Sequence, residues 1–483
     1  MNSARLIPIL GSSVIFFVAL LGYFFSPLRY NEATLTVTLF LCGILVAFYA
    51  LSKEEYPWLK GQALKCSVLF LIGYIIVHFQ CYIDILLKNI SPDDSFLMVD
   101  SRLICRCAWL SLIGLAAFVM GYFVSKGKLH PSPKSVSIVQ LSPLIIFATA
   151  MLPIWILSVG FDYFMGGYGR QSEIEVGSWA TYTALIFEMS LYAVPLLHAR
   201  NLRIQGGKLS FIRFALTLGW YNLLLCVFAV LVMLSGDRGP LIATGLFYFI
   251  AFLVQSGLKL SKLKFGMLVF IAAFVFTLLG VVRSFGPGVS FSDKISIALE
   301  TERRVESVSP QTLELAGSVR CLHYAVDYVP SQHNYLGGRF SLKNLCAVVP
   351  TGSRWLHILG LLPQKYQYAG SASFVTWVHQ GDNPTYGDGV TCVADLYIDL
   401  GVFGVALGMF VWGFWARRFD INLWSPNFPS LLFTAFIFIY TVKAVYIPRS
   451  SMMLEFKSAI WLFIILFVYE KFFGTKTFSV NRA

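Results

Sequence analysis

Charged residues are scarce in this sequence. They make up 13% of its 483 residues, about half of their usual share in a soluble domain, while hydrophobic residues make up 57%. The mean hydropathy is +0.70. A chain with so little charge cannot stay monomeric in water, so the composition excludes a soluble protein and predicts a fold whose solvent is lipid.

Cysteine pairs and metal-ligand clusters are also absent. The nine cysteines are an odd number, and most lie inside apolar runs, where a thiol behaves as a small hydrophobe. Cys321 and Cys346 share one long polar segment and are open to two interpretations, a disulfide or two buried thiols. The histidines of that segment lack the close spacing of metal ligands: His323, His333, His357 and His379. We therefore expect no metal and no other cofactor.

Positive charge is in excess, with a formal net charge of +12, but it is not gathered on one soluble face. Lys and Arg stand in short runs between apolar stretches, which is the pattern of membrane topology. We expect membrane lipids as partners and no nucleic acid.

Apolar runs long enough to cross a ~30 Å hydrocarbon layer recur along the chain, and we expect about twelve membrane helices. Residues 1–282 contain the first nine expected spans: Leu6–Phe25, Ala33–Leu51, Ala63–Leu87, Leu103–Val124, Ile138–Ser158, Ala180–Leu197, Phe214–Ser235, Pro240–Gln255 and Phe265–Val282. Residues 390–483 contain the last three: Val390–Trp415, Leu431–Ile447 and Ser458–Phe473. The predicted fold class is an all-α polytopic membrane protein with one large loop at residues 283–389.

The basic loops define the predicted orientation, because cytoplasmic loops keep positive charge. One alternating set of loops holds most of the short basic runs: residues 53–65, 126–134, 200–213, 259–264, 417–418 and 471–482. We expect this set and both termini to be cytoplasmic. The loop at 283–389 is then periplasmic, and its length is typical of a functional segment. Ser309-Pro310 predicts a helix start, and glycine and proline pairs divide the rest into short pieces, so we expect a mostly helical cap.

A polar hairpin, Ser235–Pro240, separates two apolar spans at the predicted outer surface. Arg238 in this hairpin is suited to grip phosphate oxygens, since a guanidinium binds them in a bidentate manner. The alternative is a snorkelling arginine that pairs with Asp237.

Further arginines lie on the same predicted side, where positive charge is normally depleted, and an anionic lipid headgroup would explain them. Arg283 and Arg449 rank first because each directly follows an expected span. The others are Arg170, Arg303, Arg304, Arg320, Arg339 and Arg354.

A second polar group runs from Pro384–Gly389, which contains Tyr386 and Asp388, into the tenth expected span with Asp395 and Asp399. These last two carboxylates are one helical turn apart. Carboxylates inside a span are costly and normally face a protein interior or a wet cavity. The alternative is a helix-capping role.

Three stretches of the chain resemble the Wzy-type polymerases of bacterial O-antigen and capsule assembly. They are Ser235–Pro240, Asn334–Arg339 and Gly387–Gly404, and Arg449-Ser450-Ser451 resembles the late arginine of that family. Asp395 departs from the pattern, in which glutamate is more usual at this position.

The resemblance implies an inner-membrane enzyme that moves a growing glycan from undecaprenyl diphosphate to a new lipid-linked repeat unit. It also implies a chain-length-determining co-polymerase as a partner. Arg238 and Arg283 would stabilise the diphosphate leaving group. The candidates for the general base are His323, His379, Asp388 and Asp395. The expected substrate contacts are Asp237, Arg320, Gly338, Arg339, Tyr386 and Arg449.

Two other functions stay open. An O-antigen ligase would use the same donor but lipid A core as acceptor, and a lipid-linked oligosaccharide flippase would use the arginines to guide a charged substrate. No internal repeat is visible, which disfavours transporters built from duplicated halves.

Overall fold

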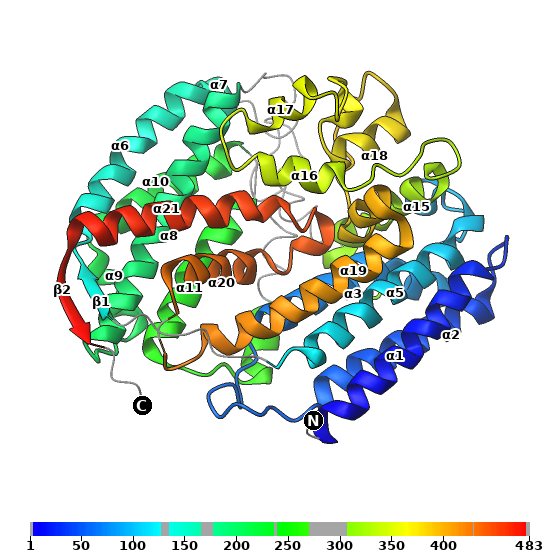
Figure 1. The fold of residues 1–483 in the computed structure, drawn as a ribbon, viewed down its shortest axis with the longest axis horizontal. Coiled ribbons are helices and arrows are strands. Elements are labelled where there is room, and N and C mark those ends of the chain that lie inside the picture. The colour runs from blue at the N-terminus through cyan, green and yellow to red at the C-terminus, as the bar shows by residue number, and fades with distance from the viewer. Residues whose placement is uncertain are drawn as a thin grey trace, which may run out of the picture.

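The structure is a computed structural model that describes residues 3–126, 135–165, 177–235, 239–269, 307–427 and 429–479. Its described part is a bundle of helices with a group of shorter helices at one end, as Figure 1 shows. This agrees with the expected all-α membrane fold, apart from one short ribbon of two strands.

The first group of long helices packs around α5 (Ile104–Val124). Its members are α1 (Ser3–Phe24), α2 (Glu32–Leu51), α3 (Cys66–Leu86) and the long α19 (Cys392–Leu423). Nearly every residue of α5 is buried, so this helix is the core of the group. Capping side chains set two of the starts: Asn31 accepts from the Thr34 N–H before α2, and Thr391 accepts from the Ala394 N–H before α19.

The second group lies across the molecule from α1 and α2 in Figure 1. It comprises α6 (Ser142–Val159), α8 (Ser178–Ile204), α10 (Trp220–Ser235), α11 (Gly239–Ser256), α20 (Leu431–Lys443) and α21 (Leu454–Phe473). α8 packs against α6, α11 and α21, so it is the centre of this group.

Eight helices of the described part are long and apolar enough to cross a membrane, or nine if one bent pair is counted as a span. That pair is the seventh expected span. It consists of α9 (Phe211–Leu218) and α10, which are bent by 93° at Gly219, a glycine with φ 52°. The eleventh expected span is shorter than predicted, because α20 ends at Lys443. The ninth lies largely outside the described residues, so the total of twelve stays a prediction.

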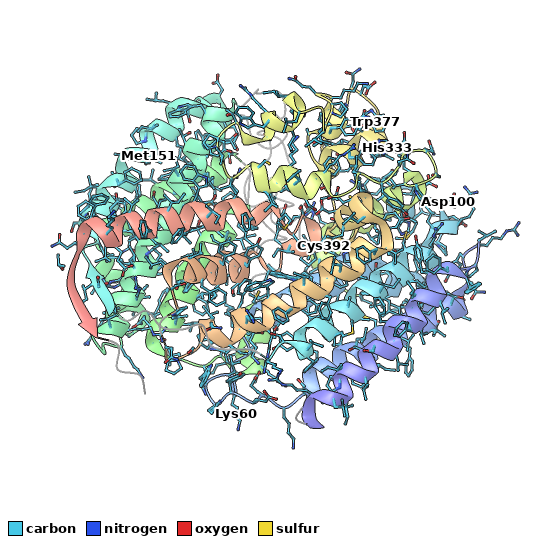
Figure 2. All side chains as sticks on the ribbon, viewed as in Figure 1. Lys60, Asp100, Met151, His333, Trp377 and Cys392 are labelled. Atoms are coloured by element: carbon cyan, nitrogen blue, oxygen red, sulfur yellow. The ribbon has the colours of Figure 1, made fainter. Side chains whose placement is uncertain are left out.

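The loops that carry the basic runs meet at one end of the bundle. Lys259 Nζ donates to the carbonyl oxygen of Lys60 at 2.9 Å, and Arg203 Nη2 donates to that of Ser425 at 2.8 Å. At this end β1 (Ser135–Val139) pairs antiparallel with β2 (Gly474–Ser479), a ribbon that the sequence analysis did not predict. Figure 1 shows the N-terminus and this ribbon well away from the short helices, and Figure 2 places Lys60 opposite His333 and Trp377.

The short helices at the other end form the cap, which we define as residues 307–389. They include η3 (Pro310–Thr312), α14 (Leu313–Ala316), α15 (Val319–Tyr328), α16 (Arg339–Cys346), α17 (Gly352–Ile358), η4 (Tyr366–Tyr368) and α18 (Ser371–Gln380). The helix predicted after Ser309-Pro310 is present but broken near Gly317. Asp84 of α3 anchors the start of the cap, since it accepts from Ser307 Oγ at 2.7 Å and from the Val308 N–H at 2.7 Å.

Candidate active site in the cap

A buried carboxylate, Asp388, joins two helices of the cap. Its Oδ1 lies 3.0 Å from Arg320 Nη2 of α15, and its Oδ2 lies 3.0 Å from His379 Nδ1 of α18. The Asp388 side chain has no exposed surface, whereas Arg320 and His379 keep 15% and 26% of theirs. The carboxylate is therefore enclosed, while the two groups that it holds reach the surface.

The loop after α18 folds back because Gly381 adopts a φ of 79° and ends the helix. Gln380 then ties the loop down. Its Oε1 accepts from the Thr385 N–H at 3.0 Å, and its Nε2 donates to the Tyr386 carbonyl at 3.0 Å and to Asp388 Oδ2 at 2.8 Å. This local network places the carboxylate beside the histidine that precedes it on α18.

Aromatic rings surround the ion pair. The His379 ring stacks on Tyr324 with the ring centres 4.7 Å apart, and Tyr386 meets it edge-on at 6.3 Å. The Arg320 guanidinium carbon lies 4.5 Å from the centre of the Phe96 ring, a cation–π contact. Tyr386 is 47% exposed, so an aromatic side chain borders the cluster where it opens to the surface.

Arg449 approaches the same place from the membrane helices. It ends η5 (Ile447–Arg449), the turn that follows α20. Burial and Asp388 raise the pKa of the Cys321 thiol to about 12, and Arg320 and Arg449 oppose this rise. Both guanidinium groups thus lie within electrostatic range of one thiol. Asp388 pairs with Arg320, and Arg449 brings a second positive charge near the same cap residues.

Gly73 of α3 makes room for the turn that carries Arg449. A Cβ atom at this position would lie 2.2 Å from the Val445 carbonyl oxygen and 3.3 Å from the Pro448 ring. Such a contact with backbone cannot be relieved by a side-chain rotation. The lack of a side chain at Gly73 therefore sets how closely η5 approaches α3.

Asp399 of α19 is far from α16 in the sequence, but its carboxylate accepts hydrogen bonds from backbone N–H groups in the first turn of that helix. Its Oδ1 accepts from the Phe340 N–H at 3.1 Å, and its Oδ2 accepts from the Ser341 N–H at 2.9 Å. Two residues further along, Gly401 adopts φ 64° and ψ −153° and breaks the helical ladder. The freed carbonyls of Ile398 and Asp399 accept from the N–H groups of Leu336 and Gly337 at 3.1 and 2.8 Å.

Asp395, one turn before Asp399, is also buried, and its neighbours are the hydroxyls of Ser371 and Ser451. Ser451 in turn accepts from Asn344 Nδ2 of α16 at 3.0 Å. The stretches Asn334–Arg339, Gly387–Gly404 and Arg449-Ser450-Ser451 are thus brought together in one polar assembly, although they are far apart in the sequence.

The remaining site candidates have different surroundings. His323 is fully buried, and its ring nitrogens lie 2.9 Å from Tyr82 Oη and 2.6 Å from the Met98 carbonyl oxygen. Burial lowers the pKa of His323 to about 4, although the Met98 carbonyl and Asp100 oppose the shift. Gly338 has a φ of 83° and precedes Arg339, whose side chain is exposed at the start of α16.

Three candidates, Asp237, Arg238 and Arg283, lie outside the described residues. The helices that flank the hairpin end at Ser235 and restart at Gly239, as the hairpin predicted. All nine cysteines are free, so Cys321 and Cys346 are not paired. Within the described ranges no three His, Cys, Asp or Glu side chains converge as a metal site.

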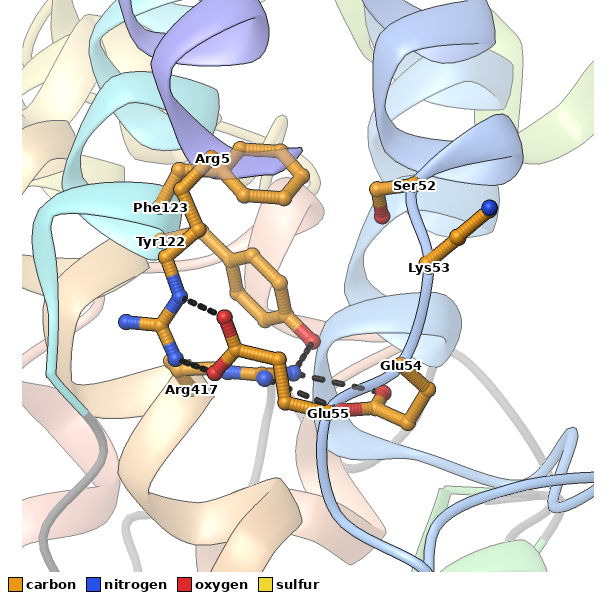
Figure 3. A pocket seen from close by; sticks show the side chains of 8 residues that line it. All are labelled: Arg5, Ser52, Lys53, Glu54, Glu55, Tyr122, Phe123 and Arg417. Atoms are coloured by element: carbon orange, nitrogen blue, oxygen red, sulfur yellow. Dashed lines mark hydrogen bonds and ion pairs between the residues drawn. The ribbon is translucent and has the colours of Figure 1, made fainter. Parts of the chain in front are cut away.

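A second buried ionic network lies at the opposite end of the bundle (Figure 3). Glu54 pairs with Arg417 Nη2 at 2.9 Å and with Lys65 Nζ at 2.8 Å, and Arg417 Nη1 donates to Tyr122 Oη at 3.0 Å. Burial alone would raise the pKa of Glu54, but Arg417 and Lys65 outweigh it and lower the pKa. The cavity beside these groups measures about 10 Å³, which is room for no more than one water.

Several side chains of the cap cluster were not predicted from the sequence. Gln380 organises the loop, Tyr324 stacks on the histidine, and Phe96 covers Arg320. None of them stands in a recognisable motif. Only their three-dimensional proximity to Asp388 marks them.

A family model described as O-antigen polysaccharide polymerase Wzy matches residues 8–478, which is nearly the whole chain. No curated protein and no solved structure matches the chain. The resemblance that the sequence motifs indicated is therefore confirmed: this chain, with its many apolar helices, belongs to the O-antigen polysaccharide polymerase Wzy family.

Proposed function

We propose that this protein polymerises undecaprenyl-diphosphate-linked oligosaccharide units at the periplasmic face of the inner membrane, and that the cap cluster is its active site. Family membership supports O-antigen polymerisation in general. The segregation of the basic loops to the end opposite the cap supports the orientation, because cytoplasmic loops keep positive charge.

The observation that carries the proposal is the enclosed Asp388 between Arg320 and His379. When His379 Nδ1–H donates to this carboxylate, Nε2 keeps its lone pair and can accept a proton. His379 then serves as the general base for the attacking sugar hydroxyl. Asp388 positions the ring and stabilises the imidazolium that forms.

The arginines act on the leaving group. The bond between the anomeric carbon and the phosphate oxygen of the donor breaks, and the bonding electrons leave with the diphosphate. The acceptor oxygen bonds to that carbon, and its proton passes to His379. Arg449 and Arg320 stabilise the negative charge that develops on the diphosphate, and Asp388 neutralises only part of their charge.

The other expected residues keep supporting roles in the proposal. Tyr324 and Tyr386 offer aromatic faces to sugar rings, and the exposed Arg339 contacts sugar or phosphate at the rim. Asp395 acts through Ser371 and Ser451 to hold the cap on the membrane helices. Arg238 and Arg283 are proposed as further phosphate-binding groups, and Asp237 as a further contact to the substrate. His323 has no free ring nitrogen, so the proposal does not use it as a base.

The test uses cells that lack the protein and are complemented at matched membrane abundance. Wild type should restore long glycan chains, while Arg449→Gln should leave products of a single repeat unit. Arg354→Gln, which removes an exposed arginine of α17 away from the cluster, is the control and should behave as wild type.

The same experiment separates the other functions. Accumulation of lipid-linked polymer without transfer to lipid A core would indicate a ligase. Lipid-linked single units that stay on the cytoplasmic side would indicate a flippase. Full-length chains with Arg449→Gln would refute the proposed active site.

A further inference from the structure

Arg106, near the start of α5, lies at the cap end of the membrane helices with an exposed side chain. Its guanidinium carbon is 4.9 Å from the centre of the Tyr23 ring of α1. Its electrostatic neighbours are the hydroxyls of Tyr23 and Tyr397 and the Cys107 thiol. Within the described part of the chain no carboxylate pairs with it, in contrast to Arg102 one turn earlier, which pairs with Asp100 at 2.5 Å.

A chain of hydroxyl groups fixes the surroundings of Arg106. Tyr23 Oη lies 3.0 Å from Tyr397 Oη of α19, and Tyr397 Oη donates to the Val329 carbonyl of the cap at 3.1 Å. Tyr335 packs edge-on against Tyr397 with the ring centres 5.8 Å apart and is itself 41% exposed. Four segments of the chain therefore converge on one exposed guanidinium that no carboxylate neutralises within the described residues.

Apolar side chains continue from this cluster along the surface of the membrane helices. Phe24 next to Tyr23 is 67% exposed, and Leu400 and Phe403, which follow Tyr397 along α19, are 42% and 68% exposed. An arginine at headgroup depth above an apolar helix surface suits a phosphate attached to a lipid tail.

The position of Arg106 relative to the proposed active site indicates which of the two lipid-linked substrates it would bind. Arg320 lies at the start of α15, and Val329, which accepts from Tyr397, directly follows its end. A ten-residue helix separates the two places by about 15 Å. The two phosphate sites would therefore lie at opposite ends of α15, an arrangement that suits a reaction between two lipid-linked molecules.

We infer that Arg106 binds the diphosphate of the acceptor lipid, while the cap cluster binds that of the donor. The exposed Tyr335 borders this site, and the buried Tyr23 and Tyr397 hold the guanidinium in place. This assignment rests on the proposed function, because only a polymerase uses two polyprenyl-diphosphate-linked substrates at once. The tail of the acceptor then lies on the surface of α1 and α19, and its glycan extends along α15 towards His379.

The test measures binding of undecaprenyl diphosphate to the purified full-length protein in nanodiscs of neutral lipid. Wild type should bind two molecules, and Arg106→Gln should weaken one of the two sites about ten- to a hundredfold. Arg449→Gln should weaken the other site, and Arg102→Gln should change neither. Size-exclusion profiles check that each variant is folded, and Arg106→Lys, which keeps the charge but loses the bidentate contact, should give an intermediate affinity.

Each result has one meaning. Two unchanged sites in Arg106→Gln would overturn the inference. Equal competition at this site by phosphatidylglycerol would show a general headgroup site and would also overturn the assignment to the acceptor. If Arg106→Gln loses a site and Arg449→Gln does not, the acceptor site at Arg106 stands, while the assignment of the donor to the cap cluster and the proposed active site fail.

Discussion

Two buried ionic clusters occupy opposite ends of this protein, and they differ in their balance of charge and in their access to the surface. At the basic-loop end, Glu54 is shared by Arg417 and Lys65, Asp420 accepts from Tyr122 at 3.2 Å, and hardly any cavity remains. In the cap, Asp388 pairs with Arg320 and His379, Arg449 adds a further positive charge near Cys321, and His379 and Tyr386 reach the surface.

The comparison shows that burial and charge alone do not mark an active site. A cluster in which the charges balance and space is absent can only hold elements together, here α5, α19 and the loop before α3. A cluster with excess charge, an accessible base and bordering aromatic rings can bind and convert an anionic ligand. Four experiments test this distinction.

The largest effect is expected for His379→Ala. Loss of a general base should lower the polymerisation rate about a hundred- to ten-thousandfold, while the fold is retained because the ring is only partly buried. Rates are measured with purified protein and lipid-linked repeat units. His333→Ala, in the same cap, is the matched control and should keep its activity. A similar loss in both variants would indicate a general defect of the cap.

Arg417→Gln should act on stability and not on chemistry. It leaves Glu54 with one partner and should lower the free energy of unfolding by about 3 kcal/mol, because a buried pair is broken. Thermal unfolding in detergent reports this change, and Arg418→Gln is the control. The rate per folded molecule should equal that of wild type. A rate defect without a stability defect would mean that this end also takes part in the reaction.

The buried His323 should make the cap sensitive to pH. Its pKa is about 4 in the fold, so between pH 6.5 and 4 the unfolded chain binds a proton that the folded chain does not. The free energy of unfolding therefore decreases as the pH is lowered from 6.5 to 4, by about 3 kcal/mol in total. His323→Gln should be less stable at neutral pH but show a flatter profile, as measured by unfolding from pH 7 to 4. An unchanged slope would contradict the assigned pKa.

The smallest effect is expected for Asp399→Asn, which weakens a cap of α16 by about 1 kcal/mol. Hydrogen exchange of residues 334–346 should speed up, while exchange in α5 stays slow. Equal protection in both proteins would mean that the contacts of Leu336 and Gly337 with α19 suffice to hold the motif.

Much of the bundle could be predicted, because apolar runs and basic loops act locally. The bounds of α2, α3, α5 and α11 agree with the expected spans to within a few residues. The bend at Gly219 could not be predicted, since the apolar pattern runs through it, and the early end of α20 at Lys443 was not predicted either. The pairing of β1 with β2 joins segments far apart in sequence, which no local pattern reveals.

The site was only partly predictable for the same reason. The sequence by itself determined the membrane class, the segregation of basic loops and the motifs that carry the family resemblance, because composition and short-range spacing encode these features. Only the tertiary structure decided that Asp388 holds Arg320 and His379, that Asp399 caps α16 and that His323 is enclosed. These roles depend on which side chains share a desolvated space, and that space is created by packing between distant segments.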